Sequence, residues 1–298
     1  MLSRSVVPGH RVDTRLTLGR LGRGPCGRFV GNERWWVTRT AAGLASVRIR
    51  ALSDRFELAA WGPGADEVID RAPEIVGAAD RPDALIPHHA SVAEALRRAR
   101  GLCIPRPGNV VETLLPVILE QKVQVAAARN SYTAIVRRWG EPAPGPAAAL
   151  GLLTPPDPAV LARVPSYAFH RLNVERKRAE TFLRAARLAP QLEPARAMPA
   201  NQARARLQVV PGVGAWTSAE VALHALGDPD AVPVGDYHLP NTVTWALAGE
   251  ARGDDARMLE LLEPYRGQRG RVIRLLTAAG MHAPKFGPRM ERYSIARL

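Results

Sequence analysis

The sequence predicts a mainly α-helical chain preceded by a small α+β domain with an antiparallel sheet. Three observations lead to this prediction. Over the first 80 residues, short runs alternate apolar and polar residues, which is typical of half-buried strands. From about residue 90 the apolar residues recur at helical spacing instead. The 298 residues are enough for two or three compact units, and we expect one domain over 1–85 and a helical domain over 86–298.

In the N-terminal domain, the first strand is expected over 12–18, where apolar or β-branched residues occupy every second position. Further strands are expected over Arg34–Arg39, Ala45–Arg50 and Arg55–Trp61, and a helix over Ala65–Ala78. Trp35 and Trp36 are adjacent in a strand, so they face opposite sides of the sheet. Packing in the core is the better explanation for at least one of them.

In the helical domain, Asn109 and Glu112 form a capping-box pattern at the start of an apolar helix. The segment Glu141–Ala149, rich in proline and alanine, is expected to connect two helices. The remaining helices are expected near residues 128–139, 157–163, 171–188, 200–209, 216–227, 240–249, 255–263 and 269–280.

The balance of charges points to a polyanionic partner. The chain has 41 Lys+Arg against 28 Asp+Glu, a formal net charge of +13. The two cysteines, Cys26 and Cys103, cannot supply the four thiolates of an iron–sulfur cluster. No run of about 18 apolar residues and no apolar leader is found, so we expect a cytoplasmic protein that works at the nucleoid, without a membrane partner.

The most informative segment lies between residues 207 and 240. Two helical runs flank the hairpin Pro211–Gly214, and a lone acid, Asp236, sits in a turn about twenty residues later. The two glycines let the chain reverse through left-handed conformations, and the N–H groups that start the second helix are then left unpaired. Such a helix N-terminus binds anions, and on a basic protein the expected anion is a DNA phosphate. The alternative is a purely structural hairpin, with Asp236 as a turn or capping residue.

This segment resembles the helix-hairpin-helix signature and catalytic aspartate of the HhH-GPD superfamily of DNA glycosylases, in particular the bacterial 3-methyladenine DNA glycosylase II (AlkA) type. Three further segments agree with that family: Glu112–Arg129, Arg176–Ala179 and Glu263–Arg266. The resemblance covers roughly residues 85–280. It implies a glycosylase core of two helical subdomains, with DNA crossing a cleft near residues 216–240.

The resemblance implies a role for each site residue. Asp236 would be catalytic, because a carboxylate stabilises the positive charge that builds on the sugar when an N-glycosidic bond breaks. Trp216 and Tyr237 would line the pocket for a flipped base, where an electron-rich ring stacks on an alkylated purine. Glu220 follows Trp216 by one helical turn, where the family type has an aromatic residue. In the base pocket its carboxylate would accept a hydrogen bond from an exocyclic amine or attract a cationic N-alkylated base. Core packing is the alternative for Trp216, and a solvated surface acid is the alternative for Glu220.

The resemblance also assigns the hairpin. Gly212, Gly214 and Thr217 would bind a DNA phosphate. The main-chain carbonyls of Gln208, Val210 and Val213 would hold a sodium or potassium ion, and no other cofactor is expected.

Trp216 occupies the position at which bifunctional relatives carry a nucleophilic lysine, and the chain has lysines only at 122, 177 and 285. We therefore expect a monomeric, monofunctional glycosylase, without AP-lyase activity, that removes a damaged, alkylated purine from double-stranded DNA in base excision repair. Two alternatives stay open. One is an 8-oxoguanine-type glycosylase, against which the missing hairpin lysine argues without excluding a monofunctional version. The other is a non-catalytic protein that binds damaged DNA. The substrate range stays open as well, because the pocket tryptophan of the family type has no counterpart between residues 266 and 280.

Overall fold

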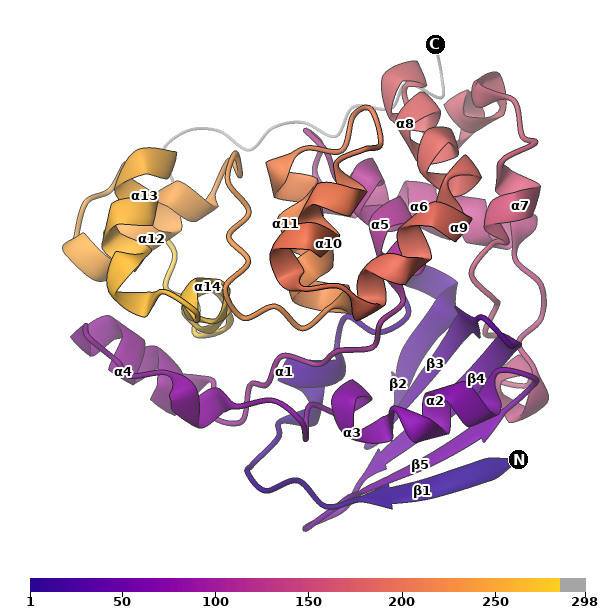
Figure 1. Ribbon diagram of the computed structural model, residues 1–298, viewed down its shortest axis with the longest axis horizontal. Helices are drawn as coiled ribbons and strands as arrows, with labels where there is room; N and C mark the ends of the chain where they lie inside the picture. Colours follow the sequence, from indigo (N-terminus) through magenta and orange to yellow (C-terminus); the bar gives the residue numbers. More distant parts are fainter. Residues whose placement is uncertain (285–298) are drawn as a thin grey trace.

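The computed structural model describes residues 1–284, in which a five-stranded sheet lies against a larger helical body (Figure 1). All neighbouring strands are antiparallel, in the order β1-β5-β4-β3-β2. The predicted fold class is confirmed. The strands are β1 (Leu2–Val6), β2 (Gly27–Val30), β3 (Glu33–Thr40), β4 (Gly43–Ala51) and β5 (Phe56–Trp61).

The strand predicted over 12–18 is wrong. Residues Thr14–Leu18 form a short helix, α1, because the side chain of Asp13 accepts a hydrogen bond from the N–H of Leu16 at 2.8 Å and caps its start. The first strand is β1 instead, which pairs with β5. Four of its five residues are exposed, so β1 carries no apolar alternation that could have revealed it. The three later strand predictions are confirmed.

The two faces of the sheet are covered by different parts of the chain. Trp36 is 1% exposed and packs on the face covered by α2 (Ala65–Asp70) and α3 (Ala72–Ile75), the two short helices that replace the single helix expected over 65–78. Trp35 lies on the other face and stacks on Trp61, with the ring centroids 5.7 Å apart. The segment around residues 142–153 covers this second face, so the expected connection between helices also completes a core.

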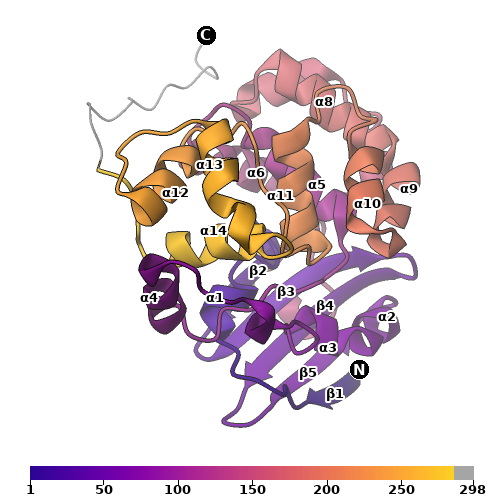
Figure 2. The same cartoon turned by 60° about the vertical axis from the view of Figure 1, so that its left-hand side comes forward.

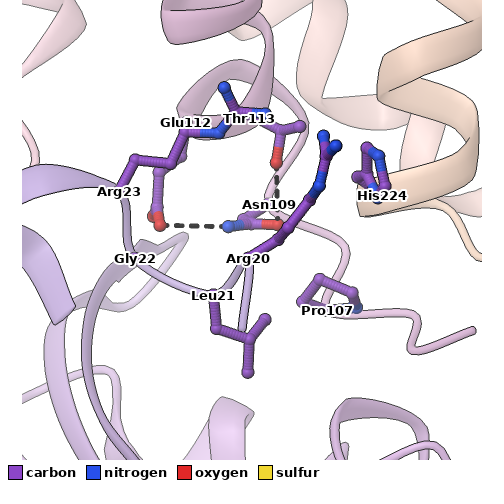
Figure 3. Close-up of a pocket in the computed structure, with 9 residues that line it drawn as sticks. All are labelled: Arg20, Leu21, Gly22, Arg23, Pro107, Asn109, Glu112, Thr113 and His224. Atoms are coloured by element: carbon purple, nitrogen blue, oxygen red, sulfur yellow. Dashed lines mark hydrogen bonds between the residues drawn. The ribbon is translucent and has the colours of Figure 1, made fainter. Parts of the chain in front are cut away.

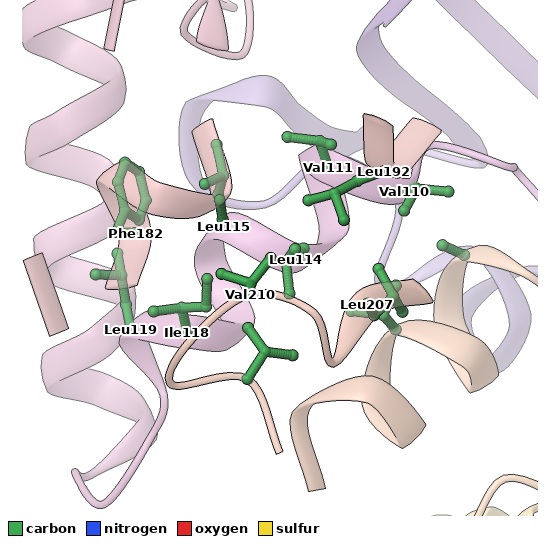
Figure 4. Close-up of a cluster of buried hydrophobic side chains, with 14 of the residues drawn as sticks. Val110, Val111, Leu114, Leu115, Ile118, Leu119, Phe182, Leu192, Leu207 and Val210 are labelled. Carbon is green, nitrogen blue, oxygen red and sulfur yellow. The ribbon is translucent and has the colours of Figure 1, made fainter. Parts of the chain in front are cut away.

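The main helical core surrounds α5, which is buried along its whole length except at Glu112 (Figure 4). Helices α6, α8, α10 and α11 pack around it, and truncating a buried leucine such as Leu114 to alanine would cost about 2–5 kcal/mol. The bounds of these helices are α5 (Val110–Leu119), α6 (Val125–Trp139), α8 (Arg176–Arg187), α10 (Ala200–Leu207) and α11 (Ala215–Ala225).

The capping box predicted for Asn109 and Glu112 does not form. The Asn109 side-chain amide donates to Glu112 Oε1 at 3.0 Å instead of capping the backbone. The Glu112 carboxylate also accepts from Trp36 Nε1 at 3.1 Å and from Thr38 Oγ1 at 2.6 Å. Burial raises the pKa of Glu112, and these hydrogen bonds act against that rise. Glu112 therefore fixes α5 to the sheet.

A second helical group, α4 with α12, α13 and α14, packs around its own apolar core (Figure 2). Helix α4 follows the sheet in sequence yet packs on α14, so the C-terminal helices and an early segment share this core. The domain boundary at residue 85 stays a prediction. The bounds are α4 (Ala90–Arg98), α12 (Leu239–Ala248), α13 (Asp255–Leu262) and α14 (Arg269–Ala278). The remaining short helices are α7 (Pro158–Leu161), α9 (Ala189–Leu192), η1 (Gly24–Cys26), η2 (Pro82–Ala84), η3 (Gly145–Ala148), η4 (Ser166–Leu172), η5 (Glu193–Ala197) and η6 (Glu263–Tyr265).

Candidate active site

The hairpin between α10 and α11 is shaped by one of its two glycines. Gly212 has a φ of +99°, and a Cβ there would lie 2.3 Å from Thr181 Oγ1, so both backbone conformation and space require glycine. Gly214 has a φ of −103° and an extended backbone, and no atom lies within 4 Å of where its Cβ would be. The expectation that both glycines turn through left-handed conformations is therefore wrong for Gly214.

The first N–H groups of α11 face away from the protein's own acceptors. The first bond of the helix runs from Ser218 N to Gly214 O at 3.0 Å. Within residues 1–284, the N–H groups of Ala215, Trp216 and Thr217 donate to no acceptor. Together with the helix dipole, three free N–H groups at one end form a site for an anion.

The buried side chain of Thr217 connects this end of α11 to Gln121. Thr217 is 2% exposed, and its hydroxyl accepts from Gln121 Nε2 at 2.8 Å. The same Gln121 nitrogen donates to the carbonyl of Gly212 at 3.0 Å. Gln121 thus fastens the hairpin to the turn after α5. The Thr217 hydroxyl points inward, which leaves its N–H as the group that can meet a phosphate.

The carbonyls expected to hold a monovalent cation lie on both sides of the hairpin turn. The Val210 oxygen accepts from Val213 N at 2.9 Å, which uses one of its two lone pairs. In the described part of the chain, the Gln208 and Val213 oxygens accept no hydrogen bond. Neutral carbonyl oxygens suit a hard cation, so this donor set fits sodium or potassium, and the ion stays a prediction. No group of three or more His, Cys, Asp or Glu side chains in residues 1–284 could hold a metal.

Asp236 is fixed between this hairpin and the next helix. Its Oδ2 accepts from Trp216 Nε1 at 2.9 Å, while its Oδ1 accepts from the N–H groups of His238 at 2.7 Å and Leu239 at 2.9 Å. Asp236 follows Gly235, whose φ is +90° and whose N–H donates to Asp255 Oδ2 at 3.0 Å. The carboxylate therefore does cap the start of α12, as the structural alternative required. It also remains partly exposed beside Trp216.

Trp216 and Tyr237 do not form a closed pocket. Trp216 is half-buried beside Asp236, whereas Tyr237 is 86% exposed and contacts the ring of His238 edge-on, with centroids 4.9 Å apart. The Tyr237 ring is therefore open to solvent. Its role in the base pocket stays a prediction.

Glu220 is not a solvated surface acid. Its side chain is 12% exposed, and Oε2 lies 3.3 Å from Arg20 NH1 and 3.5 Å from His224 Nε2. Burial alone would raise the pKa of Glu220, but His224 and the guanidinium groups of Arg20 and Arg23 outweigh this and lower it. Burial lowers the pKa of His224 to about 3, so this imidazole is neutral at pH 7.

Three of these residues were not identified from the sequence as parts of the site: Arg20, Gln121 and His224. Gln121 belongs to a segment that resembles the family, and His224 follows Glu220 by one helical turn, so both carried a weak signal. Arg20 lies 200 residues before Glu220, and only the fold brings it there.

The other two segments of the resemblance support the core. Arg178 of α8 is 8% exposed and donates to the carbonyl of Leu119 at 3.0 Å, at the end of α5. The hydroxyl of Tyr265 accepts from His88 N at 3.1 Å and contacts His89 Nδ1 at 2.7 Å.

Two solved structures with a similar arrangement of elements are DNA glycosylases. The 3-methyladenine DNA glycosylase of Archaeoglobus fulgidus superimposes with a TM-score of 0.76 at 16% identity, over 93% of this chain and 98% of that one. The 8-oxoguanine glycosylase/lyase of Clostridium acetobutylicum gives 0.72 at 13% identity, over 93% and 95%. The chain therefore has the fold of these glycosylases, as the resemblance implied.

Among curated proteins, the chain is similar to the "probable bifunctional transcriptional activator/DNA repair enzyme AlkA" of Mycobacterium tuberculosis, with 32% identity over 146 residues. The match covers 48% of this chain and 28% of the relative's length. No protein-family model matches the chain. In the described residues, no helix is long and apolar enough to cross a membrane.

Proposed function

We propose that this chain is a monofunctional DNA glycosylase that removes an alkylated purine by hydrolysis of its N-glycosidic bond. The observation that carries the proposal is the carboxylate of Asp236, held by Trp216 and partly exposed close to a helix end with three free N–H groups. The glycosylase fold, and the names of the AlkA relative and of the archaeal 3-methyladenine glycosylase, support the same substrate class.

The hairpin would position the DNA. The N–H groups of Ala215, Trp216 and Thr217 would bind one phosphate without contacting any base. The net charge of +13 would add attraction to the rest of the backbone. Because neither contact is specific for sequence, the enzyme would bind undamaged duplex too, with an affinity that falls steeply as salt is raised.

The chemical step would take place at Asp236. The damaged nucleotide would leave the stack and place its sugar beside the carboxylate, where a negative charge stabilises the developing positive charge at C1′. Asp236 would also orient the attacking water, and the product would be an abasic site. Trp216 is unable to form a Schiff base, so the protein would not cleave the strand itself.

The test is a set of duplexes, each with a single lesion, incubated with the protein and then treated with alkali. We expect strand breaks at an alkylated purine after alkali and none without it. Breaks at 8-oxoguanine instead would support the second candidate function, for which the similar fold of the Clostridium enzyme is the motivation. The absence of breaks at every lesion would contradict the proposal and favour a non-catalytic DNA-binding protein.

A further inference from the structure

One face of α11 carries the side chains that surround the site. Trp216, Glu220 and His224 follow one another at intervals of four residues, so they form a stripe along one side of the helix. Trp216 contacts Asp236, and Glu220 lies about 6 Å further along the helix axis. A purine that stacks on Trp216 with its sugar at Asp236 would therefore present its far edge to Glu220.

The Glu220 carboxylate is held in place with one oxygen still available. Both of its contacts, with Arg20 and with His224, fall on Oε2. His224 is neutral, because burial lowers its pKa, so Arg20 is the cation in direct contact with the carboxylate. Burial lowers the pKa of Arg274 of α14, and the nearby charge of Glu220 opposes this lowering. These groups fix the orientation of Glu220 and leave Oε1 as an acceptor.

Arg20 comes from the N-terminal domain and is free to contact a ligand. Its side chain is 53% exposed although it pairs with Glu220, so part of the guanidinium remains accessible as a donor. Arg20 and His224 both line a small cavity of about 20 Å³, together with Asn109 and Thr113 (Figure 3). This end of the stripe is therefore polar, unlike the aromatic pocket that the family resemblance implied.

We infer that Arg20 and Glu220 recognise the edge of the flipped base through hydrogen bonds. This recognition restricts excision to alkylated purines whose hydrogen-bonding edge is intact. The inference rests on the proposed function and specifies its substrate class. Glu220 Oε1 would accept from an N–H of the base, and Arg20 would donate to the neighbouring oxygen or ring nitrogen. Guanine alkylated at N7 and adenine alkylated at N3 retain such a donor–acceptor pair. In 1,N6-ethenoadenine the extra ring closes this edge.

The physical reason for selectivity is the cost of leaving charged groups unpaired. A base with a blocked edge would displace water from Glu220 and Arg20 without replacing the hydrogen bonds. Sites that bind a substrate through such groups discriminate by about 10⁴–10⁵-fold at best against an analogue that lacks the partner atoms. An apolar pocket would discriminate far less between the same bases.

The experiment compares release of two kinds of lesion under single-turnover conditions. Dimethyl sulfate-treated duplex supplies 7-methylguanine and 3-methyladenine, measured by chromatography, and a synthetic duplex supplies 1,N6-ethenoadenine. We expect the wild type to release the methylated purines at least about a hundredfold faster. Arg20→Met and Glu220→Gln should each slow that release about tenfold or more and leave the release of ethenoadenine unchanged or faster.

Arg55→Met is the matched control, because Arg55 lies on the same domain at the far end of a β-hairpin and pairs only with Asp54 and Glu57 among the described residues. It should leave all rates unchanged. Two results would contradict recognition of the base edge by Arg20 and Glu220. One is that Arg20→Met and Glu220→Gln slow the release of both kinds of lesion equally, and the other is that the wild type prefers ethenoadenine. If the wild type released no base from any duplex, the proposed function would be wrong, and recognition of the base edge with it.

Discussion

The indole N–H of Trp216 donates to Oδ2 of Asp236 at 2.9 Å, across twenty residues of sequence. This bond joins the start of α11 to the start of α12, because Oδ1 of the same carboxylate accepts two N–H groups there. One carboxylate thus fixes the orientation of the hairpin helix, the aromatic ring and the turn relative to one another. Part of this carboxylate remains exposed, and we expect the sugar to meet it there.

Asp236→Asn should reduce the single-turnover rate of base release by about a hundredfold or more, since the negative charge acts only as the sugar becomes cationic. The asparagine retains an oxygen for the N–H groups of His238 and Leu239, so α12 keeps its cap. Affinity for undamaged duplex, measured by fluorescence anisotropy, should not fall. A variant that works at a near wild-type rate would remove Asp236 from the mechanism.

Trp216→Phe should lower the rate of base release about tenfold, because it retains a ring for stacking and removes the donor that orients Asp236. Binding to undamaged duplex should be unaltered, as the ring acts only after the base has left the stack. Trp245 of α12 is partly exposed, so Trp245→Phe is the matched control and should leave the rate of base release unchanged. If Trp216→Phe is as active as the control, the hydrogen bond has no part in the reaction.

Borohydride should trap no covalent protein–DNA adduct, because α11, the helix that follows the hairpin, contains no lysine. Lys122 and Lys177 are both exposed, on the turn after α5 and on α8. The measurement is a denaturing gel of enzyme, lesion duplex and borohydride, with a bifunctional glycosylase as the positive control. An adduct that disappears in Lys122→Ala or Lys177→Ala would show a lyase step and contradict the monofunctional assignment.

The two hairpin glycines should respond differently to substitution. Gly212→Ala should lower Tm and cost more than about 1 kcal/mol, because φ is +99° and the new Cβ would collide with Thr181. Gly214→Val should leave Tm nearly unchanged, since its backbone is extended and its surroundings are open. It should nevertheless weaken binding to damaged and intact duplex alike by blocking a phosphate. A Gly214→Val protein with normal affinity would place the phosphate elsewhere.

Glu193 should make stability depend on pH. It accepts from Val111 N at 3.0 Å at the start of α5, and burial, aided by the charge of Glu112, raises its pKa from 4.5 to about 7. Between these two pH values the unfolded chain has lost the proton that the folded protein keeps, so stability falls as pH rises from about 4.5 to 7.

Glu193→Gln, which stays neutral, should therefore raise Tm at pH 8 and change it little at pH 4.5. The difference corresponds to up to roughly 3 kcal/mol. Glu57→Gln, at a side chain that is 41% exposed, is the control for an altered net charge. Thermal denaturation at both pH values measures the effect, and an equal gain at the two would contradict it.

The class of the fold could be predicted from the chain alone, because the periodicity of apolar residues is a local property. The helices from α5 onwards and strands β3, β4 and β5 follow their apolar patterns, and the spacing of Gly212 and Asp236 was enough to identify a candidate site. Local patterns failed where one residue changed their meaning, as when Asp13 capped a helix within an alternating run. They also gave no sign of β1, which is held mainly by backbone hydrogen bonds to β5.

What surrounds each site residue depends on how distant segments of the chain pack together. Arg20 meets Glu220 only because the fold brings the turn after α1 beside α11, and no pattern along the chain encodes a contact between residues 200 positions apart. The same holds for the inward-facing hydroxyl of Thr217, for the open backbone at Gly214 and for the exposure of Tyr237. The residue types of the site can be read from the sequence. Their burial, partners and charge environment arise from packing between distant segments, which local physics does not specify.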